Sequence, residues 1–237
     1  MKVTKPAVRA KSHGAGRSLA ILLVACLYLL WSLPLRAAEP ATVTFSLDFP
    51  ASDPAHYLIS VQSDGHARYE CSVKISAQSE DTEAYQTDFN FSDATRARIF
   101  ALAAQAHYFS GEIDSGNRKL AFTGAKKLTY SEGPRHFSSD YNFSSLPPVQ
   151  QLTSLFQSVA ATLEYGRRLA HYHKYQKLAL SDELKRMEDQ ARSGDLGELE
   201  AIRPILQEIY DDASVINVVR ARAQRIMEMG KGATAKR

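Results

Sequence analysis

The pattern that most constrains the fold lies on either side of Asp64-Gly65. Before this pair, Tyr57, Ile59 and Val61 alternate with mostly polar residues, and a similar alternation continues after it. A period of two residues is typical of a strand with one buried face. Asp-Gly supplies the positive φ angles that a tight hairpin turn requires. The sequence therefore predicts an antiparallel hairpin, and with it an antiparallel sheet.

Other patterns extend this sheet and then give way to helices. Alternating segments predict further strands at residues 41–50, 68–75, 85–91, 126–132 and 135–143. Apolar stripes at helical spacing predict helices at residues 93–108, capped by Ser92, and from residue 147 onward. Strands followed by helices alone indicate the α+β class. We expect two hairpin-plus-helix units, residues 57–108 and 119–163, followed by a C-terminal helical extension.

Three further expectations concern helix ends. Ser145 is expected to cap the helix that begins with two prolines, and Asp195 and Glu198 have the spacing of a capping box. Pro204 is expected to kink or split the helix that follows. The charged residues of the last helices are interpreted as solvated faces with weak pairing. Residues from Gly230 onward are expected to form a frayed tail.

The first 38 residues have the plan of a secretory signal. Basic residues precede an apolar stretch from Leu19 to Leu35, and Ala37 and Ala38 supply the small residues at which we expect cleavage. Two alternatives stay open, because the stretch is long enough to serve as a membrane anchor and Cys26 stands in a context similar to a lipobox. The expected organisation is a signal peptide at 1–38, an α+β sheet domain at 39–146, a helical region at 147–229 and a disordered tail at 230–237.

Loss of this segment would change the charge of the protein. The chain has 29 basic and 26 acidic residues, and six of the basic residues lie in the first 38, so 23 basic residues would remain against 26 acidic ones. A net negative charge removes the main support for nucleic-acid binding. Cys71 would be the one remaining cysteine, so no intramolecular disulfide could form.

Two segments are similar to phosphate-binding motifs. Gly111 to Lys119 (GEIDSGNRK) is interpreted as a turn, because it follows a helix rather than a strand, and because Glu112 and Asp114 would repel phosphate. The second segment is residues 122–127 (FTGAKK). Its two lysines, Lys126 and Lys127, are adjacent in a strand pattern, so they should point to opposite faces of the sheet and form no clamp for a phosphate. We therefore expect no nucleotide or other cofactor.

The sequence offers few groups for catalysis or metal binding. His171 and His173 lie two residues apart on a helix, where side chains do not share a face, so we expect no metal site. Cys71 is expected to face the core and to be inert. No Gly-x-Ser-x-Gly motif is present, so a hydrolytic site would have to be dispersed, drawing on serines and on His56, His66, His107 and His136. We therefore predict no catalytic, cofactor-binding or metal-binding residue.

An aromatic group surrounds the second predicted hairpin, at Tyr130, His136, Phe137, Tyr141 and Phe143. Aromatic residues are enriched both in the cores of small sheets and in binding hot spots. Packing in the core and display on a recognition surface are both open interpretations.

Residues 126–145 (KKLTYSEGPRHFSSDYNFSS) and 154–172 (SLFQSVAATLEYGRRLAHY) resemble a group of uncharacterised exported proteins of environmental Gram-negative bacteria. The resemblance implies a periplasmic or secreted protein and assigns no activity. We predict a non-enzymatic protein that binds or scaffolds an unknown envelope protein, with no nucleic-acid partner and no membrane contact once the signal is removed. The alternatives are an envelope hydrolase with a dispersed His/Ser site and an inhibitor that docks an enzyme.

Overall fold

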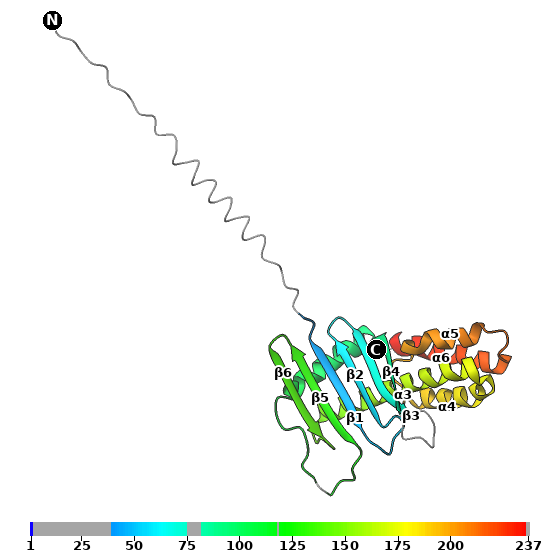
Figure 1. The fold of residues 1–237 in the computed structure, drawn as a ribbon, viewed down its shortest axis with the longest axis horizontal. Helices are drawn as coiled ribbons and strands as arrows, with labels where there is room; N and C mark the ends of the chain where they lie inside the picture. The colour runs from blue at the N-terminus through cyan, green and yellow to red at the C-terminus, as the bar shows by residue number, and fades with distance from the viewer. Residues whose placement is uncertain (2–38, 75–81, 118, 236–237) are drawn as a thin grey trace. The chain divides into compact units, whose positions relative to one another are not determined.

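The computed structural model describes Met1 and residues 39–74, 82–117 and 119–235 (Figure 1). The fold lies in the second of the two units of the chain, residues 39–237. The predictions about the signal peptide, the anchor and Cys26 fall on residues 2–38, which lie outside the described residues.

An antiparallel sheet forms one layer of the molecule (Figure 1). Its strands are β1 (Thr42–Asp48), β2 (His56–Gln62), β3 (His66–Lys74), β4 (Thr82–Asn90), β5 (Ala125–Glu132) and β6 (Arg135–Tyr141). They lie in the order β4-β3-β2-β1-β5-β6. β1 is central, so that Phe45 lies opposite Ile59 on one side and Leu128 on the other. The α+β class is confirmed.

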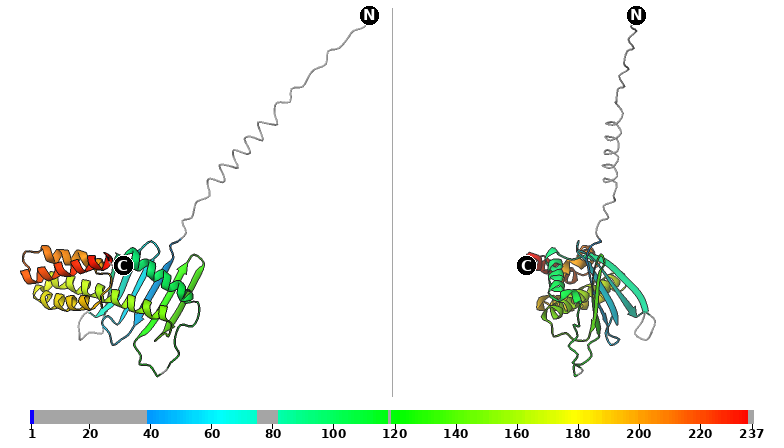
Figure 2. Two further views of the ribbon diagram at one scale, coloured as in Figure 1. Left: turned by 180° about the vertical axis from the view of Figure 1, so that it is seen from behind. Right: turned by 90° about the vertical axis from the view of Figure 1, so that its left-hand side faces the viewer.

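The strand pattern places one face of the sheet against helices. The apolar residues of the alternating segments are buried, among them Phe45, Ile59 and Tyr69. Gly65 joins β2 to β3 with a φ of 101°, a conformation that glycine adopts without strain. The α-helices α2 (Asp93–Gln105) and α3 (Pro147–Tyr175) cover this face (Figure 2). The Phe45 and Phe156 rings stack between the two layers with centroids 5.4 Å apart.

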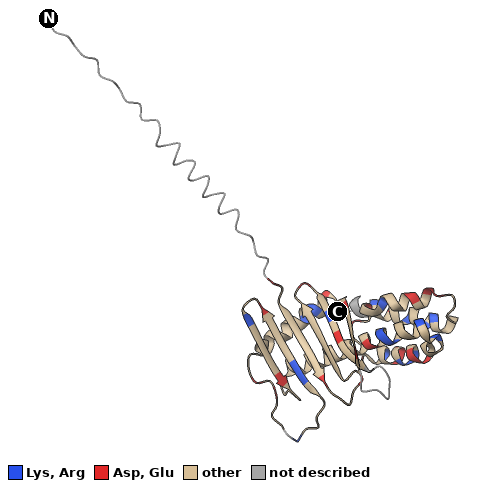
Figure 3. Cartoon of the chain, viewed as in Figure 1, with Lys and Arg blue, Asp and Glu red and all other residues tan. Residues whose placement is uncertain are grey.

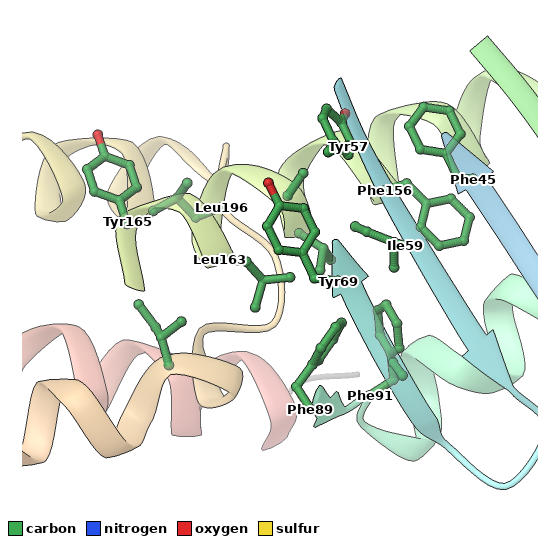
Figure 4. Packing of buried hydrophobic residues seen from close by; sticks show 14 of the residues in the cluster. Phe45, Tyr57, Ile59, Tyr69, Phe89, Phe91, Phe156, Leu163, Tyr165 and Leu196 are labelled. Atoms are coloured by element: carbon green, nitrogen blue, oxygen red, sulfur yellow. The ribbon is translucent and has the colours of Figure 1, made fainter. Parts of the chain in front are cut away.

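The C-terminal half of α3 continues beyond the sheet and forms a helical extension with the elements that follow it (Figure 1). These are η2 (Lys177–Ala179), α4 (Leu180–Ser193), η3 (Leu199–Ile202), α5 (Arg203–Asp211) and α6 (Asn217–Ala235). Apolar residues run without interruption from the sheet into the extension, where Leu163, Tyr165 and Leu196 are buried (Figure 4). None of the described helices combines the length and the apolar character needed to cross a membrane.

The two halves of the sheet do not repeat one another as expected. β2, β3 and β4 form a three-stranded meander before α2, whereas only β5 and β6 precede α3. β1 belongs to neither half, because it pairs with both β2 and β5. The arrangement as two hairpin-plus-helix units is therefore not confirmed.

The predicted helix ends have mixed outcomes. Ser92 caps α2, and its hydroxyl accepts a hydrogen bond from the Thr95 N–H at 3.4 Å. Ser145 does not cap α3; the residue at that position is Leu146, whose side chain makes no capping bond. The prolines do lie in the first turn of α3, because their missing N–H groups cost nothing there.

The second capping prediction is wrong, because Glu198 is used elsewhere. Its carboxylate accepts hydrogen bonds from the Ser92 N–H at 3.0 Å and the Ser92 hydroxyl at 2.9 Å, so it joins the extension to the start of α2. Pro204 lies in the first turn of α5, which begins directly after η3, so the chain is split there into two helical elements, as predicted. A tail is predicted from Gly230 onward, but α6 continues through this segment as far as Ala235.

Candidate functional site

The long connection before β5 is held against the end of the sheet. The Ser139 hydroxyl of β6 bonds to the carbonyl oxygens of Phe109 and Gly111, at 3.2 and 2.8 Å. Asp114 accepts hydrogen bonds from the N–H groups of Gly116 and Asn142, both at 2.6 Å. These bonds, that from Gly116 first, hold the pKa of Asp114 below its usual range. The described residues of this segment, 111–117 and Lys119, thus form a loop in which the Asp114 carboxylate already occupies the Gly116 N–H group.

Lys126 and Asn142 fix the second half of this connection. The Lys126 ammonium donates to the Thr123 carbonyl at 3.2 Å and hydroxyl at 2.9 Å, to the Gly124 carbonyl at 3.2 Å and to the Asn142 carbonyl at 2.9 Å. The Asn142 amide bonds to the Thr123 N–H at 3.0 Å and the Ala121 carbonyl at 3.1 Å. Burial lowers the pKa of Lys126, which is only 4% exposed. The loop is therefore fixed by hydrogen bonds over most of its length.

Lys127 behaves differently from its neighbour. It points to the open face of the sheet, where its ammonium lies 3.2 Å from Asp140. The prediction that the two lysines point to opposite faces is confirmed. The structural role of Lys126 was missed, although its inward position in the alternation with Leu128 and Tyr130 was the signal that could have found it.

An aromatic surface, defined here as Phe49, Leu120, Phe122 and Phe143, lies on this fixed loop and the chain beside it. Phe122 is 58% exposed, Phe143 44% and Leu120 41%. The Phe49 and Phe122 rings meet edge to face with centroids 6.0 Å apart. Large apolar side chains held at such exposure on an ordered segment are a feature of binding surfaces.

The aromatic group predicted around the second hairpin is divided between core and surface. Tyr130 and Tyr141 are buried, and the Tyr141 hydroxyl bonds to Thr153 of α3 at 2.6 Å. Phe137 is half-buried against the core, whereas His136 is exposed. Phe143 joins the aromatic surface with residues from the preceding connection. Core packing is therefore correct for the tyrosines and not for Phe143.

A second candidate is the polar cluster around Glu164 under the sheet. The Tyr69 hydroxyl donates to Glu164 at 2.7 Å, the Cys71 thiol lies 3.4 Å from the same oxygen, and Arg167 donates twice to the other oxygen, at 2.9 and 2.8 Å. Burial, followed by the charge of Glu164, raises the pKa of Cys71 to about 12 and that of Tyr69 far above its usual range. The thiol is thus protonated at neutral pH and buried, as the sequence predicts for an inert cysteine.

Two open hollows flank α3, and neither is lined by a histidine. One, of about 350 Å³, lies beside Glu164, whose carboxylate is already saturated with donors. The other, of about 680 Å³, is lined mainly by amide and hydroxyl side chains such as Gln150, Ser154 and Ser158. His56, His66, His107 and His136, the histidines of the predicted alternative, line neither of these two hollows.

The histidines at the end of α3 have separate structural environments. His173 lies 2.9 Å from Asp212, which also binds Lys177 at 2.6 Å and the Ser214 hydroxyl at 2.7 Å. Lys177, followed by Ser214, lowers the pKa of Asp212. A hydrolytic triad requires the histidine between the hydroxyl and the carboxylate. Here histidine and serine each contact the carboxylate instead, so the group joins the end of α3 to the loop before α6.

His171 and His173 have different neighbours. The His171 ring lies 5.1 Å from that of Tyr175 and does not share Asp212. Within the described ranges, no group of three potential metal-ligating side chains comes together.

The sequence predicts that the charged residues of the last helices form solvated faces with weak pairing. The structure shows that some of these residues are buried and paired instead. Positive and negative residues are interleaved along the extension (Figure 3). Glu188 of α4 is buried, and its carboxylate binds Arg192 at 2.5 Å, Arg222 at 2.9 Å and Arg225 at 2.7 Å. Glu183 binds Arg168 and Arg186 in the same way. These buried carboxylates connect helices that are distant in sequence.

Comparison of the sequence with known protein families finds no match, and a search of curated proteins finds no similar one.

Proposed function

We propose that the protein is an exported, non-enzymatic binding protein of the bacterial envelope, and that it holds another protein on the aromatic surface. The observation that carries this proposal is the exposure of Phe122, before β5, and Phe143, after β6, on two segments that Lys126 and Asn142 bond together. A surface that is already ordered loses little conformational entropy when a partner binds. Aromatic side chains in such a setting supply much of the binding energy of protein interfaces.

Export is proposed from the sequence of residues 1–38, whose basic start and apolar stretch are typical of a secretory signal. The resemblance to exported proteins of Gram-negative bacteria supports the same compartment. A mature form with more acidic than basic residues favours a protein partner over a nucleic acid.

A binding role also fits the state of the reactive side chains. Burial keeps the Cys71 thiol protonated, and the Glu164 carboxylate is fully occupied by protein donors. Ser214 and His173 share Asp212 and do not contact each other as a nucleophile and its base would. The described groups closest to a hydrolytic site thus serve packing and connection.

The test places a photoreactive phenylalanine analogue at Phe122 in cells and, as a matched control, at Tyr175. Both residues are aromatic and exposed, at 58% and 63%, but Tyr175 lies at the end of α3. We expect one discrete envelope protein to cross-link from position 122 and not from 175. With that protein purified, the double variant F122S/F143S should bind at least ~10-fold more weakly than Y175S. Equal cross-linking from both positions, or unchanged affinity of the double variant, would refute the proposal.

A further inference from the structure

β4 is a border strand with an unpaired outer edge. Its nine residues pair with β3 in an unbroken antiparallel register from Thr82 to Asn90. No proline or lysine interrupts it, and no other strand of the described chain pairs with it. Natural sheets commonly protect such edges with bulges, prolines or lysines, because exposed N–H and C=O groups accept another strand.

The register shows which backbone groups face outward. The Phe91 N–H donates to the Gly65 carbonyl at 3.1 Å, which continues the β3–β4 pairing by one residue. Hydrogen-bonded pairs alternate along an antiparallel ladder, so Tyr85 and Thr87 direct their backbone groups toward β3. Ala84, Gln86 and Asp88 therefore direct their N–H and C=O groups away from the sheet, while their side chains lie on its open face.

The opposite border of the sheet, β6, is contacted by the long connection before β5. Ser139 of β6 binds the carbonyls of Phe109 and Gly111, and Asp114 binds the Asn142 N–H directly after the strand. The connection thus lies against one border of the sheet, whereas no described strand pairs with the outer edge of β4.

Charge indicates what β4 would accept. Both charged residues of the strand are acidic and exposed; Asp88 lies on the open face with Glu70 of β3, whereas Glu83 shares the parity of Phe89 and lies on the other face. Arg68 pairs with Asp88 at 2.8 Å, which leaves Glu83 and Glu70 without a salt-bridge partner among the described residues. We propose that the outer edge of β4 accepts an extended basic segment of another polypeptide as an additional antiparallel strand. This surface is separate from the aromatic surface and goes beyond the function proposed above.

The test measures binding of a labelled nine-residue peptide, in which lysine alternates with valine, by fluorescence anisotropy. Its lysines should lie on the open face with Asp88 and Glu70, and their N–H groups should bond to β4. We expect an analogue methylated on the lysine N–H groups to bind at least ~10-fold more weakly, and one methylated on the valine N–H groups to keep its affinity. A glutamate version should also bind at least ~10-fold more weakly.

A pair of protein variants provides the second arm. Gln86→Pro removes an N–H that faces outward and is not used by β3, so the sheet should remain folded, as circular dichroism would show. This variant should lose at least ~10-fold in peptide affinity, whereas Gln86→Thr, which keeps the N–H, should not. If the lysine–valine peptide does not bind, or if both methylated analogues bind equally, the inference is wrong. These results would leave the aromatic surface and its cross-linking test unaffected.

Discussion

Lys126 is a charged residue in a position where the strand pattern requires an apolar one. Its ammonium is accommodated because three carbonyls and one hydroxyl accept its hydrogen bonds. A buried charge is tolerated only when hydrogen bonds of this kind replace water. The residue therefore connects the core of the sheet to the loop that carries the aromatic surface.

We predict that Lys126→Met destabilises the protein by about 2–3 kcal/mol, because the acceptors around the ammonium lose their donor while remaining buried. Lys127→Met is the matched control; it removes only an exposed pair with Asp140 and should cost about 0–1 kcal/mol. Urea denaturation followed by circular dichroism measures both. Equal losses for the two variants would contradict the role given to Lys126.

Cys71 should be unreactive in the folded protein. Its thiol is buried and its pKa is raised to about 12, so very little thiolate exists at pH 8. We expect iodoacetamide to modify Cys71 at least ~100-fold more slowly in the native protein than in urea, with peptide mass spectrometry distinguishing it from Cys26. Comparable rates in the two conditions would show that the thiol is accessible.

At the scale of elements, the path of α3 depends on a glycine in its interior. Gly166 lies where α3 meets η3, and a Cβ at this position would come within 2.5 Å of Ile202. Glycine inside a helix costs about 1 kcal/mol relative to alanine. Close approach of the two elements explains why that cost is accepted here.

Gly166→Ala should therefore destabilise the protein by about 1–3 kcal/mol, since overpacking outweighs the gain in helix propensity. Gly111→Ala is the control, because a Cβ added there would meet no atom within 4 Å and the φ of this residue is not positive. The Gly111→Ala substitution should change the free energy of unfolding by no more than about 0.5 kcal/mol. Thermal unfolding of both variants gives the comparison, and a stabilised Gly166→Ala variant would show that Ile202 can move aside.

For the whole molecule, ion pairs determine how the extension responds to acid. Hydrogen bonds from Arg225, and then from Arg222, lower the pKa of Glu188. Burial raises the pKa of Glu183, but the hydrogen bonds from Arg168 and Arg186 outweigh burial, so the pKa of Glu183 is also lowered. The ordinary value of both is 4.5. A lowered native pKa stabilises the folded state above the unfolded value, and that stability is lost as pH falls through the native pKa.

We predict that the melting temperature stays constant from pH 7 to about 5 and falls steeply below about 4.5. Glu188→Gln should lower the free energy of unfolding by about 3 kcal/mol at pH 7, because three arginines remain around a neutral amide. The melting temperature of this variant should also depend less on pH than that of the original protein. Melting curves across this range test both statements. An unchanged acid slope in the variant would exclude Glu188 as a contributor.

Export makes a prediction for the whole chain as well. The protein recovered from the envelope fraction should begin after Ala37 or Ala38 and should lack tryptophan fluorescence, because Trp31 is the one tryptophan of the sequence. Intact mass measures the start of the chain directly. A mass that includes Met1 would indicate a retained anchor, and an added acyl mass at Cys26 would indicate lipidation.

The sequence by itself determined the elements of this fold and their order. Alternation predicted the strands, Asp64-Gly65 predicted the turn between β2 and β3, and apolar stripes predicted the helices that cover the sheet. These features are local, because a side chain's direction follows from the period of its own strand or helix. Helix ends were predicted less well, since a carboxylate such as that of Glu198 can bond to a distant segment instead of its own helix.

Only the tertiary structure decided which polar groups are buried and which aromatic residues are displayed. Glu164 meets Tyr69 across 95 residues of chain, and Glu188 meets Arg225 across 37. Phe143 is exposed, whereas Tyr141, two residues earlier, is buried under α3. Periodicity specifies the face on which a side chain lies. It does not specify the distant segment that covers that face or supplies a hydrogen-bond partner, because both depend on how the chain closes in space.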